Sequence, residues 1–347
     1  MHLRQTCLCL TLLAACTSSL RPQTPPPEPS DPIALLSVGR EKNGLEGPSI
    51  RPWHIHGTYH QYGKKGVVED AGVFEEWWIS PVKYKRMFAG KTFSQIDYAN
   101  GQGLFRAGSQ DWPPGAMMLL RETLIDPLPD PAELKEFQLV KQSVPAGQAN
   151  LECVSMTFPL RPNLKVTGDF FPTACFDPKL PVLRIYSAGA GYRAVFDHIV
   201  AFQGHYLAKE IRVSSGGEEF AELTIDTIES VADPADSVVA PPAEAKPVDL
   251  SLIVLKEDST RHFPGLLKKA IPAYPEMAKN TRTQGTVVIQ ATVRPDGRLS
   301  DLKVMSGSPM LEQAALDAVR QWVYRPFGVL GEPRSFQTEI RVIFNIG

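Results

Sequence analysis

The sequence predicts an α+β protein: a β-rich, half-barrel-like middle domain made of a curved antiparallel sheet with helices, followed by a small strand-strand-helix-strand domain. Three observations predict this class. Apolar and polar residues alternate over many short segments between 53 and 230, which is the periodicity of half-buried strands. Proline-rich stretches at 17–32 and 232–250 divide the chain into parts that can each bury a core. Hairpin, helix and strand patterns then follow one another after residue 285.

The first residues read as an export signal. Arg4 supplies a positive charge before an apolar run that ends at Leu13. That run is shorter than the about 20 apolar residues that span a bilayer. The sequence LAAC, which ends at Cys16, resembles the lipobox of bacterial lipoproteins, and the resemblance implies that Cys16 is acylated and anchors the chain. Thr17 after the cysteine favours the outer membrane. The alternative is cleavage nearby by an ordinary signal peptidase, which leaves no lipid.

Charge and cysteine content agree with export. Lys plus Arg number 36 against 38 for Asp plus Glu, so no broad positive field is present to attract nucleic acid. Outside the leader and Cys16, the remaining cysteines are Cys153 and Cys175. An even remainder in an oxidising compartment predicts one disulfide between them. Two separate buried thiols are the alternative.

The predicted organisation follows from these segments. We expect a signal peptide at 1–16, a Pro-rich tether at 17–32, a β-rich domain at 33–231, a Pro/Ala-rich linker and lead-in at 232–269, and a terminal domain at 270–347.

The middle domain begins with a helix signal, in which Asp31 caps and Pro32 takes the first helical position. PWHIHGTYHQY then alternates as a strand does and places His54, His56 and His60 on one face. Histidines side by side raise a metal site as an alternative. We predict a polar strand face and no metal, because zinc sites draw ligands from several elements.

Further strands are predicted at GVFEEWWIS, VKYKRMFAG and KTFSQIDYA, as an antiparallel meander. A helix is predicted after Asp130, with Pro131 in its first turn and Glu133 closing a capping box before LKEFQLV. Strands return in PVLRIYSAG, AVFDHIVAFQG, HYLAKEIRVSS and EEFAELTIDTIES.

The terminal domain reads as a hairpin, a helix and a last strand. TVVIQATV and LSDLKVM flank a turn at Asp296-Gly297. Ser308 and Pro309 begin a helix whose apolar residues recur at spacings of three and four. SFQTEIRVIFNI then alternates from Phe336 to Ile346.

These residues resemble the C-terminal domain of the TonB family over about 270–347. The matching motifs, in order, are Tyr274-Pro275 with Ala278, Gly285-Thr286-Val287, Arg294 to Gly297, Val304 to Gly307, Ala314 to Trp322, and Pro326 with Gly331. The resemblance implies that the domain binds a peptide of an outer-membrane receptor or another envelope protein, added as a strand beside its own last strand. The candidate binding residues are Phe336, Gln337, Thr338, Glu339, Ile340, Arg341, Val342, Ile343, Phe344, Asn345 and Ile346. The alternatives are a plain core strand, or an edge that pairs with a second copy.

The middle domain resembles the LolA/LolB-like and RseB-like envelope proteins in its strand pattern. That resemblance implies an apolar cavity, and the candidate lining residues are Phe74, Trp77, Trp78 and Phe88, with plain core as the alternative for most of them. A lipid or lipoprotein carrier or sensor is therefore the alternative function.

No GxSxG, HExxH, Walker or CxxC motif occurs outside the leader, so we predict no enzyme and no cofactor. The chain also departs from a TonB energy transducer, because it has no inner-membrane helix and no long spacer. The prediction is a non-enzymatic protein of a Gram-negative-type cell envelope. It faces the periplasm on a lipid anchor, binds an envelope partner and supports TonB-dependent transport.

Overall fold

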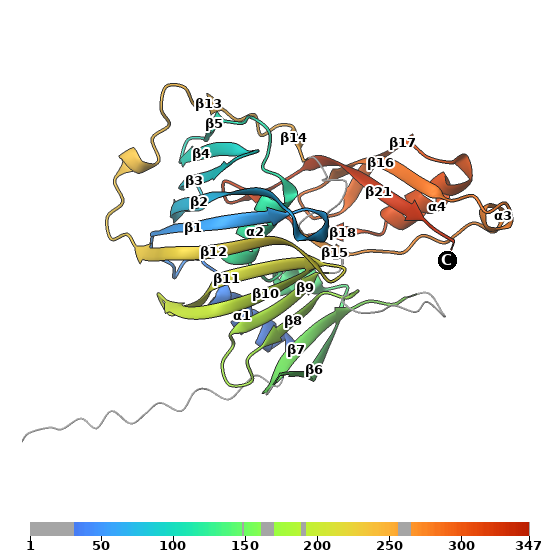
Figure 1. Cartoon of the computed structure of the whole chain (residues 1–347), viewed down its shortest axis with the longest axis horizontal. Helices are drawn as coiled ribbons and strands as arrows, with labels where there is room; N and C mark the ends of the chain where they lie inside the picture. The colour runs from blue at the N-terminus through green and yellow to red at the C-terminus, as the bar shows by residue number, and fades with distance from the viewer. Residues whose placement is uncertain (1–30, 148, 161–169, 189–191, 256–264, 347) are drawn as a thin grey trace, which may run out of the picture.

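The computed structural model describes residues 31–147, 149–160, 170–188, 192–255 and 265–346. A large curved antiparallel sheet forms the middle domain, and a small sheet with one long helix forms the terminal domain beside it (Figure 1). The fold class is the one the alternation predicts: α+β, with strands dominant.

The large sheet has 13 strands in the order β13-β5-β4-β3-β2-β1-β12-β11-β10-β9-β8-β7-β6. Its strands are β1 (Trp53–Tyr62), β2 (Val68–Ser80), β3 (Lys83–Gly90), β4 (Ser94–Asn100), β5 (Leu104–Gly108), β6 (Gln138–Ala146), β7 (Ala149–Thr157), β8 (Thr173–Phe176), β9 (Leu183–Ala188), β10 (Tyr192–Phe202), β11 (His205–Ser215), β12 (Glu218–Ser230) and β13 (Lys246–Pro247). Neighbouring strands are antiparallel throughout, so the predicted meander is confirmed.

Two helices pack on the inner face of this sheet, α1 (Pro32–Asn43) and α2 (Gly115–Ile125). The Asp31 carboxylate caps α1 by accepting from the Ile33 N–H at 3.1 Å, as predicted. Helix α2 was not predicted. It begins after Pro114 with no side-chain cap, so the strongest sequence signal for a helix start is missing.

The helix predicted after Asp130 is wrong beyond its first turn. Asp130 does cap, by accepting from the Ala132 N–H at 2.8 Å, but only the 3-10 turn η2 (Pro131–Leu134) forms. The rest of the segment enters β6, because pairing with β7 along its whole length outweighs local helix propensity. Glu133 closes no capping box; its Oε2 is buried without a hydrogen-bond partner among the described residues. Two other 3-10 turns are η1 (Lys64–Gly66) and η3 (Asp236–Val238).

The terminal sheet has four strands in the order β14-β21-β16-β17. The elements of this part are β14 (Ile253–Val254), β15 (Leu266–Lys268), α3 (Glu276–Asn280), β16 (Gly285–Val293), β17 (Leu299–Ser306), α4 (Pro309–Val319), β18 (Val323–Tyr324), β19 (Phe327–Val329), β20 (Glu332–Arg334) and β21 (Phe336–Phe344). The predicted strand-strand-helix-strand order is confirmed. Gly297 makes the β16–β17 turn at φ 77°, where a Cβ would lie 1.8 Å from the Tyr324 carbonyl oxygen.

The segment 232–255 is mostly irregular, apart from η3 and two short strands, and it is not a free tether. Its strand β13 pairs with the edge strand β5, and its strand β14 pairs in parallel with the start of β21. The Val239 side chain is buried as well. The segment therefore lies against both domains.

A single cluster of buried hydrophobic residues extends through both domains, from Leu35 in α1 to Phe344 in β21. Ring contacts cross the boundary, as between Trp112 of the middle domain and Phe327 of β19, whose centroids are 5.6 Å apart. The terminal domain is therefore docked on the middle domain, and apolar burial holds it there.

Candidate functional site

The predicted binding strand is β21, and one of its edges is partly open. It pairs with β16 from Phe336 to Phe344 with no shift of register. On its other side β14 reaches only Gln337, whose carbonyl accepts from the Leu255 N–H at 2.8 Å. Beyond that point no strand covers this edge among the residues that the structure describes.

The direction of the free backbone groups follows from that last contact. Along a strand, successive residues point their N–H and C=O groups to opposite sides. Because Gln337 points its groups toward β14, Glu339, Arg341 and Ile343 point theirs to the same side, which is the open one. A peptide laid there would find donors and acceptors in alternation.

The side chains of β21 alternate between core and solvent. Those facing the core are Phe336, Thr338, Ile340, Val342 and Phe344. Glu339, Arg341 and Ile343 face outward, and the Ile343 side chain is 63% exposed. Ile346, which the alternation placed with the core residues, is 38% exposed because the strand ends at Phe344.

The other edge of the small sheet, β17, is less regular. Its register with β16 shifts between Val288 and Ile289 and again between Gln290 and Thr292. Asp301 has φ 51°, a left-handed conformation inside the strand. Bulges of this kind blunt an edge against further pairing, so β21 is the better template for an added strand.

The aromatic residues predicted to line a cavity are not equivalent. Phe74 and Trp78 are buried in the core on the inner face of β2. Phe88 is also buried and borders the pocket described next. Trp77 lies on the opposite face, stacked on His54 with centroids 3.8 Å apart, so its expected place at the cavity is wrong. The reason is the alternation of side chains along β2, which turns neighbouring residues to opposite faces.

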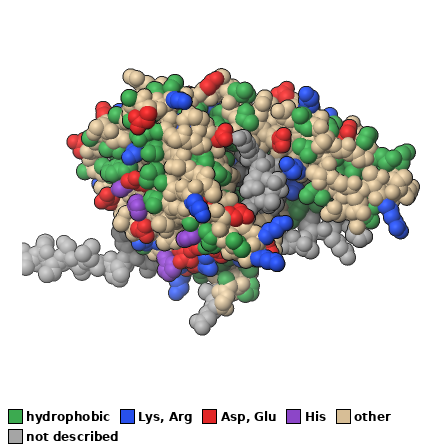
Figure 2. All heavy atoms as spheres, turned by 45° about the horizontal axis from the view of Figure 1, so that its top comes forward, with side chains coloured by type: hydrophobic (Ala, Val, Ile, Leu, Met, Phe, Trp, Pro, Cys, Tyr) green, Lys and Arg blue, Asp and Glu red, His purple; other side chains and the backbone are tan. Residues whose placement is uncertain are grey.

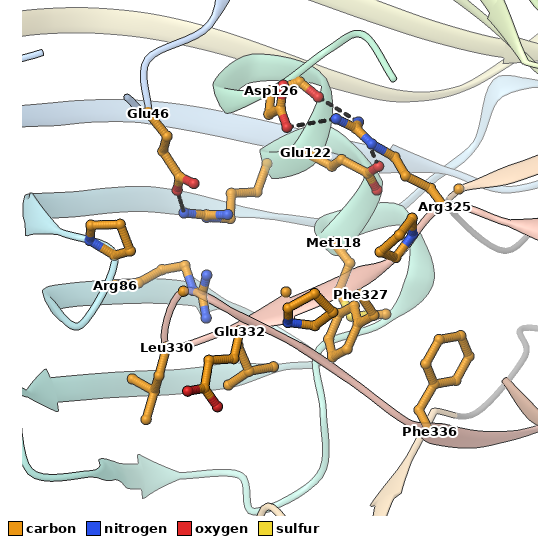
Figure 3. A pocket seen from close by; sticks show the side chains of 18 of the residues that line it. Glu46, Arg86, Met118, Glu122, Asp126, Arg325, Phe327, Leu330, Glu332 and Phe336 are labelled. Atoms are coloured by element: carbon orange, nitrogen blue, oxygen red, sulfur yellow. Dashed lines mark hydrogen bonds and ion pairs between the residues drawn. The ribbon is translucent and has the colours of Figure 1, made fainter. Parts of the chain in front are cut away.

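A pocket of about 420 Å³ lies where the two domains meet (Figure 3). Strand β3 and helix α2 form one side of it, and the β19–β20 hairpin of the terminal domain forms the other. In this stretch the sequence shows only the motif residues Pro326 and Gly331, and it predicts no strands there. The pocket therefore exists only while the terminal domain is docked.

Arg325 is the main polar contact across the boundary. Its guanidinium donates to Glu122 Oε1 at 3.0 Å, to Asp126 Oδ2 at 2.6 Å and to the carbonyl oxygens of Asp126 and Leu128 (Figure 3). Burial alone would lower the pKa of Arg325, but the charges of Asp126 and Glu122 outweigh it and raise that pKa. Burial raises the pKa of Glu122, and the Arg325 charge opposes that rise.

A second arginine, Arg86, extends from β3 into the pocket (Figure 3). It donates to Asp97 Oδ2 at 3.1 Å, and its side chain is only 13% exposed. The same carboxylate is already held by Arg106, through Oδ1 at 2.7 Å and Oδ2 at 3.1 Å. Two buried guanidinium groups thus share one carboxylate.

Sequence reasoning missed both arginines, although each left a signal. Arg86 falls between Tyr84 and Phe88 at spacing two, so it shares their inward face. Arg325 stands in the apolar run VYRPFGVL, where no acidic neighbour is available. A charge placed in either setting needs a partner distant in sequence.

On the histidine face of β1, the side chains of His54 and His56 contact carboxylates of neighbouring strands. His54 contacts Glu75 Oε1 at 2.8 Å and Glu229 Oε1 at 3.0 Å, and His56 contacts Asp226 Oδ2 at 3.3 Å. Figure 2 shows histidines (purple) beside acidic side chains (red) on one face of the middle domain. Within the described ranges no group of three or more His, Cys, Asp or Glu residues is arranged to hold a metal ion.

The cysteines fall in two parts of the chain. Cys153 and Cys175 lie opposite each other in the β7–β8 ladder and form a disulfide with an S–S distance of 2.08 Å. Cys16 lies outside the described residues. In the part of the chain that is described, no helix has the length and apolar character needed to cross a membrane.

Comparison with known proteins finds a family match over the terminal domain. Residues 270–346 match the family described as Gram-negative bacterial TonB protein C-terminal, in agreement with the resemblance drawn from the motifs. Protein TonB of Klebsiella pneumoniae is 29% identical over 96 residues, which are 27% of this chain and 40% of that protein. Protein TonB of Escherichia coli (strain K12) is 33% identical over 85 residues, 24% of this chain and 34% of that protein. The chain thus spans well under half the length of these relatives.

Solved structures are similar to each domain separately. A LolA superfamily protein from Nitrosomonas europaea covers 60% of this chain and 96% of its own, with 8% identity and a TM-score of 0.39. The match to MucB covers 64% of this chain and 66% of the MucB chain, with 13% identity and a TM-score of 0.32. The match to the TonB C-terminal domain of Pseudomonas aeruginosa covers 23% of this chain and 84% of that domain's chain, with 28% identity and a TM-score of 0.21.

Proposed function

We propose that this chain is a non-enzymatic docking protein of the cell envelope of a Gram-negative-type bacterium. Its terminal domain binds an extended peptide of an outer-membrane receptor or another envelope protein, and so supports TonB-dependent transport across the outer membrane. The observation that carries the proposal is the edge of β21 beyond Gln337, which no strand of the described residues covers, on a domain that matches the TonB C-terminal family.

The geometry of β21 supports strand addition in three ways. Its backbone is regular, which suits a ladder of main-chain hydrogen bonds. The groups of Glu339, Arg341 and Ile343 point outward and offer that ladder. The exposed Ile343 side chain offers an apolar contact to an alternate side chain of the peptide.

Strand β14 limits the length of the incoming peptide. Ile253 and Leu255 are each 1% exposed and belong to the core, so β14 stays in place when a partner arrives. The partner therefore lies alongside 339–344, the part of β21 that β14 leaves uncovered, and pairs over about five residues, a length typical of a short strand.

We also propose that the docking protein is held at the membrane by lipid on Cys16 and faces the periplasm. The lipobox-like LAAC supports this proposal. Two or more acyl chains, each contributing about 0.8 kcal/mol per buried methylene, would hold the chain durably.

A proline scan of β21 tests the docking site in the full-length chain. Arg341→Pro removes one outward N–H and places a ring on the open edge, while the β16 side of the ladder stays intact. Arg341→Ala is the matched control, because it deletes the side chain and keeps the N–H. Binding is measured by fluorescence anisotropy with ten-residue peptides from the periplasmic segments of outer-membrane receptors of the same organism.

We expect Arg341→Pro to weaken binding at least tenfold, about 1.4 kcal/mol, and Arg341→Ala to change it less than threefold. Thermal melting checks that both variants fold. Equal binding by the native chain and Arg341→Pro, or no binding of any such peptide by the native chain, would rule out strand addition at β21.

A further inference from the structure

We propose that strand β6, an edge of the large sheet, pairs with β6 of a second copy of this chain and joins two molecules into a dimer. The surface is distinct from the β21 edge, and the proposal does not depend on peptide docking. The sequence of β6 identifies the occupant, because it is complementary to itself when two copies run antiparallel.

The two edges of the large sheet differ in how well they suit pairing. One edge is β13, which has only two residues, Lys246 and Pro247, and proline cannot donate to a ladder. The other edge is β6, which has nine residues and pairs with β7 along its whole length without a shift of register (Figure 1). Among the residues that the structure describes, no strand pairs with the other side of β6. A regular edge of this length is a template for an added strand.

A hydrogen bond two strands away shows which backbone groups of β6 are free. The Met156 N–H of β7 donates to the Pro172 carbonyl, just before β8, at 2.8 Å. Because neighbouring residues point their groups to opposite sides, Ser155 points its groups toward β6, and its partner Val140 points back toward β7. The next residue, Lys141, and every second residue from it therefore point their N–H and C=O groups to the open side.

One antiparallel register brings these groups and two exposed valines together. When Gln142 lies opposite its own copy, Lys141 lies opposite Ser143 of the second copy, and the outward groups of both residues bond each other. Val140 then lies opposite Val144 of the second copy, at the positions between those bonds, where side chains are closest. Val140 is 45% exposed and Val144 is 37% exposed in the single chain, so the dimer removes apolar surface from water.

Two residues of β6 are of kinds that oppose edge pairing, but neither closes this edge. Lys141 is the one charged residue of β6, and its ammonium turns back to Glu152 Oε2 of β7 at 3.6 Å. The register places no second lysine opposite it. Pro145 has no N–H, but it stands one residue before the end of the strand, so only the last bonds of the ladder are lost.

These features favour a copy of the same chain over an unrelated peptide. Two identical strands that pair antiparallel are related by a two-fold axis, which here passes beside Gln142. The amide of Gln142 carries donors and acceptors, so the two copies can bond each other across the axis. Apolar side chains thus meet apolar ones, and the amide meets an amide.

Sedimentation equilibrium of the purified full-length chain tests the dimer, in density-matched detergent with micelles in large excess over protein. We expect a dissociation constant of roughly 1–100 µM, because one strand pair is a small interface. Ser143→Pro removes an outward N–H from each copy and leaves the β7 ladder intact, so it should weaken the dimer at least tenfold. Ser143→Ala keeps that N–H and should change the constant less than threefold. Melting curves check that both variants fold.

Charges at the two valines test the register. The double variant Val140→Lys with Val144→Lys opposes like charges and should weaken the dimer at least tenfold. The double variant Val140→Glu with Val144→Lys opposes unlike charges, so its dissociation constant should stay within threefold of the native value. Both valines are exposed in the single chain, so the two variants should melt at similar temperatures as monomers.

Three outcomes would overturn the proposal: a native chain that stays monomeric at concentrations tenfold above the expected range, a dimer that Ser143→Pro leaves intact, or equal constants for the two charged double variants. A dimer that is lost in Arg341→Pro and kept in Ser143→Pro would place self-association at β21 instead. Peptide binding is measured separately, so failure of either proposal leaves the other standing.

Discussion

Arg325 of the terminal domain donates to the carboxylate of Asp126, the residue that follows helix α2, at 2.6 Å, although the two residues lie 199 positions apart in the chain. Glu122, one helical turn earlier, accepts from the same guanidinium at 3.0 Å. The contact joins the domain that matches the TonB C-terminal family to the middle domain. It adds a charged contact to the apolar burial that holds the two domains together.

Replacing Arg325 with Met should destabilise the whole chain by about 3 kcal/mol, because it leaves the partly buried Glu122 carboxylate without its counter-charge and leaves Asp126 with Arg40 alone. Chemical denaturation measures the effect. Arg320→Met is the control: Arg320 pairs with Asp317 on the surface of the molecule, and such pairs contribute about 0–1 kcal/mol.

Adding Glu122→Gln and Asp126→Asn to Arg325→Met should recover part of the loss, since no unpaired charge then remains. A cost for Arg325→Met no larger than that for Arg320→Met would mean that apolar contacts alone hold the domains together.

The Cys153–Cys175 disulfide should stabilise the β7–β8 hairpin, whose cysteines are 22 residues apart. On the chain-entropy model a loop of this size contributes about 3 kcal/mol. The double variant Cys153→Ala with Cys175→Ala should therefore melt at a lower temperature than the oxidised chain. Reductant should lower the melting temperature of the native chain and leave that of the double variant unchanged; an equal shift in both would argue against the bond.

The buried Asp70 carboxylate should make the free energy of unfolding depend on pH. Its carboxylate is 3% exposed and accepts from the Lys91 N–H at 2.9 Å, the Thr92 N–H at 3.1 Å and the Tyr59 hydroxyl at 3.2 Å. Burial would raise the pKa of Asp70, but these hydrogen bonds outweigh burial and lower it. The carboxylate therefore contributes stability above its unfolded pKa of about 4, which is lost as the pH falls through the lower folded value.

Asp70→Asn should cost about 1–3 kcal/mol at pH 7, and the difference from the native chain should shrink below about pH 4. Urea unfolding at several pH values measures it. Glu339→Gln, exposed on β21, is the control and should leave the curve unchanged. A difference for Asp70→Asn that stays constant down to pH 2 would show that the charge of Asp70 is not responsible.

Lipidation of Cys16 predicts that a radiolabelled fatty acid enters the native chain and the Cys9→Ala variant, but not Cys16→Ala. The unlipidated variant should move from the membrane fraction to the soluble envelope fraction, because the methylenes of the acyl chains no longer bind. Label retained in Cys16→Ala would place the lipid elsewhere, and no label in any variant would remove the anchor.

Local patterns were enough to predict most of the strands. Alternation fixed which side of β21 faces the core, and the Asp31-Pro32 start located α1, because period and capping depend only on neighbours in sequence. The same local reasoning failed at LKEFQLV, where pairing with β7 decides the outcome.

The pocket could not be predicted, because it depends on contacts between distant segments. Arg325 meets Asp126, and Trp112 meets Phe327, only after both domains have folded. The family match describes the terminal domain alone, at 270–346, and says nothing about the surface on which it rests. Neither periodicity nor motif spacing carries that information.

The pairing of β13 with β5 has a practical consequence for anyone who shortens this chain. Strand β13 lies after residue 231, yet it covers the last strand on that side of the large sheet. A fragment that stops at 231 would leave the backbone of β5 bare, and bare strand edges recruit other copies into aggregates. Aggregation of such a fragment in solution would then result from the loss of the strand that pairs with β5, and it would not show that the intact protein self-associates.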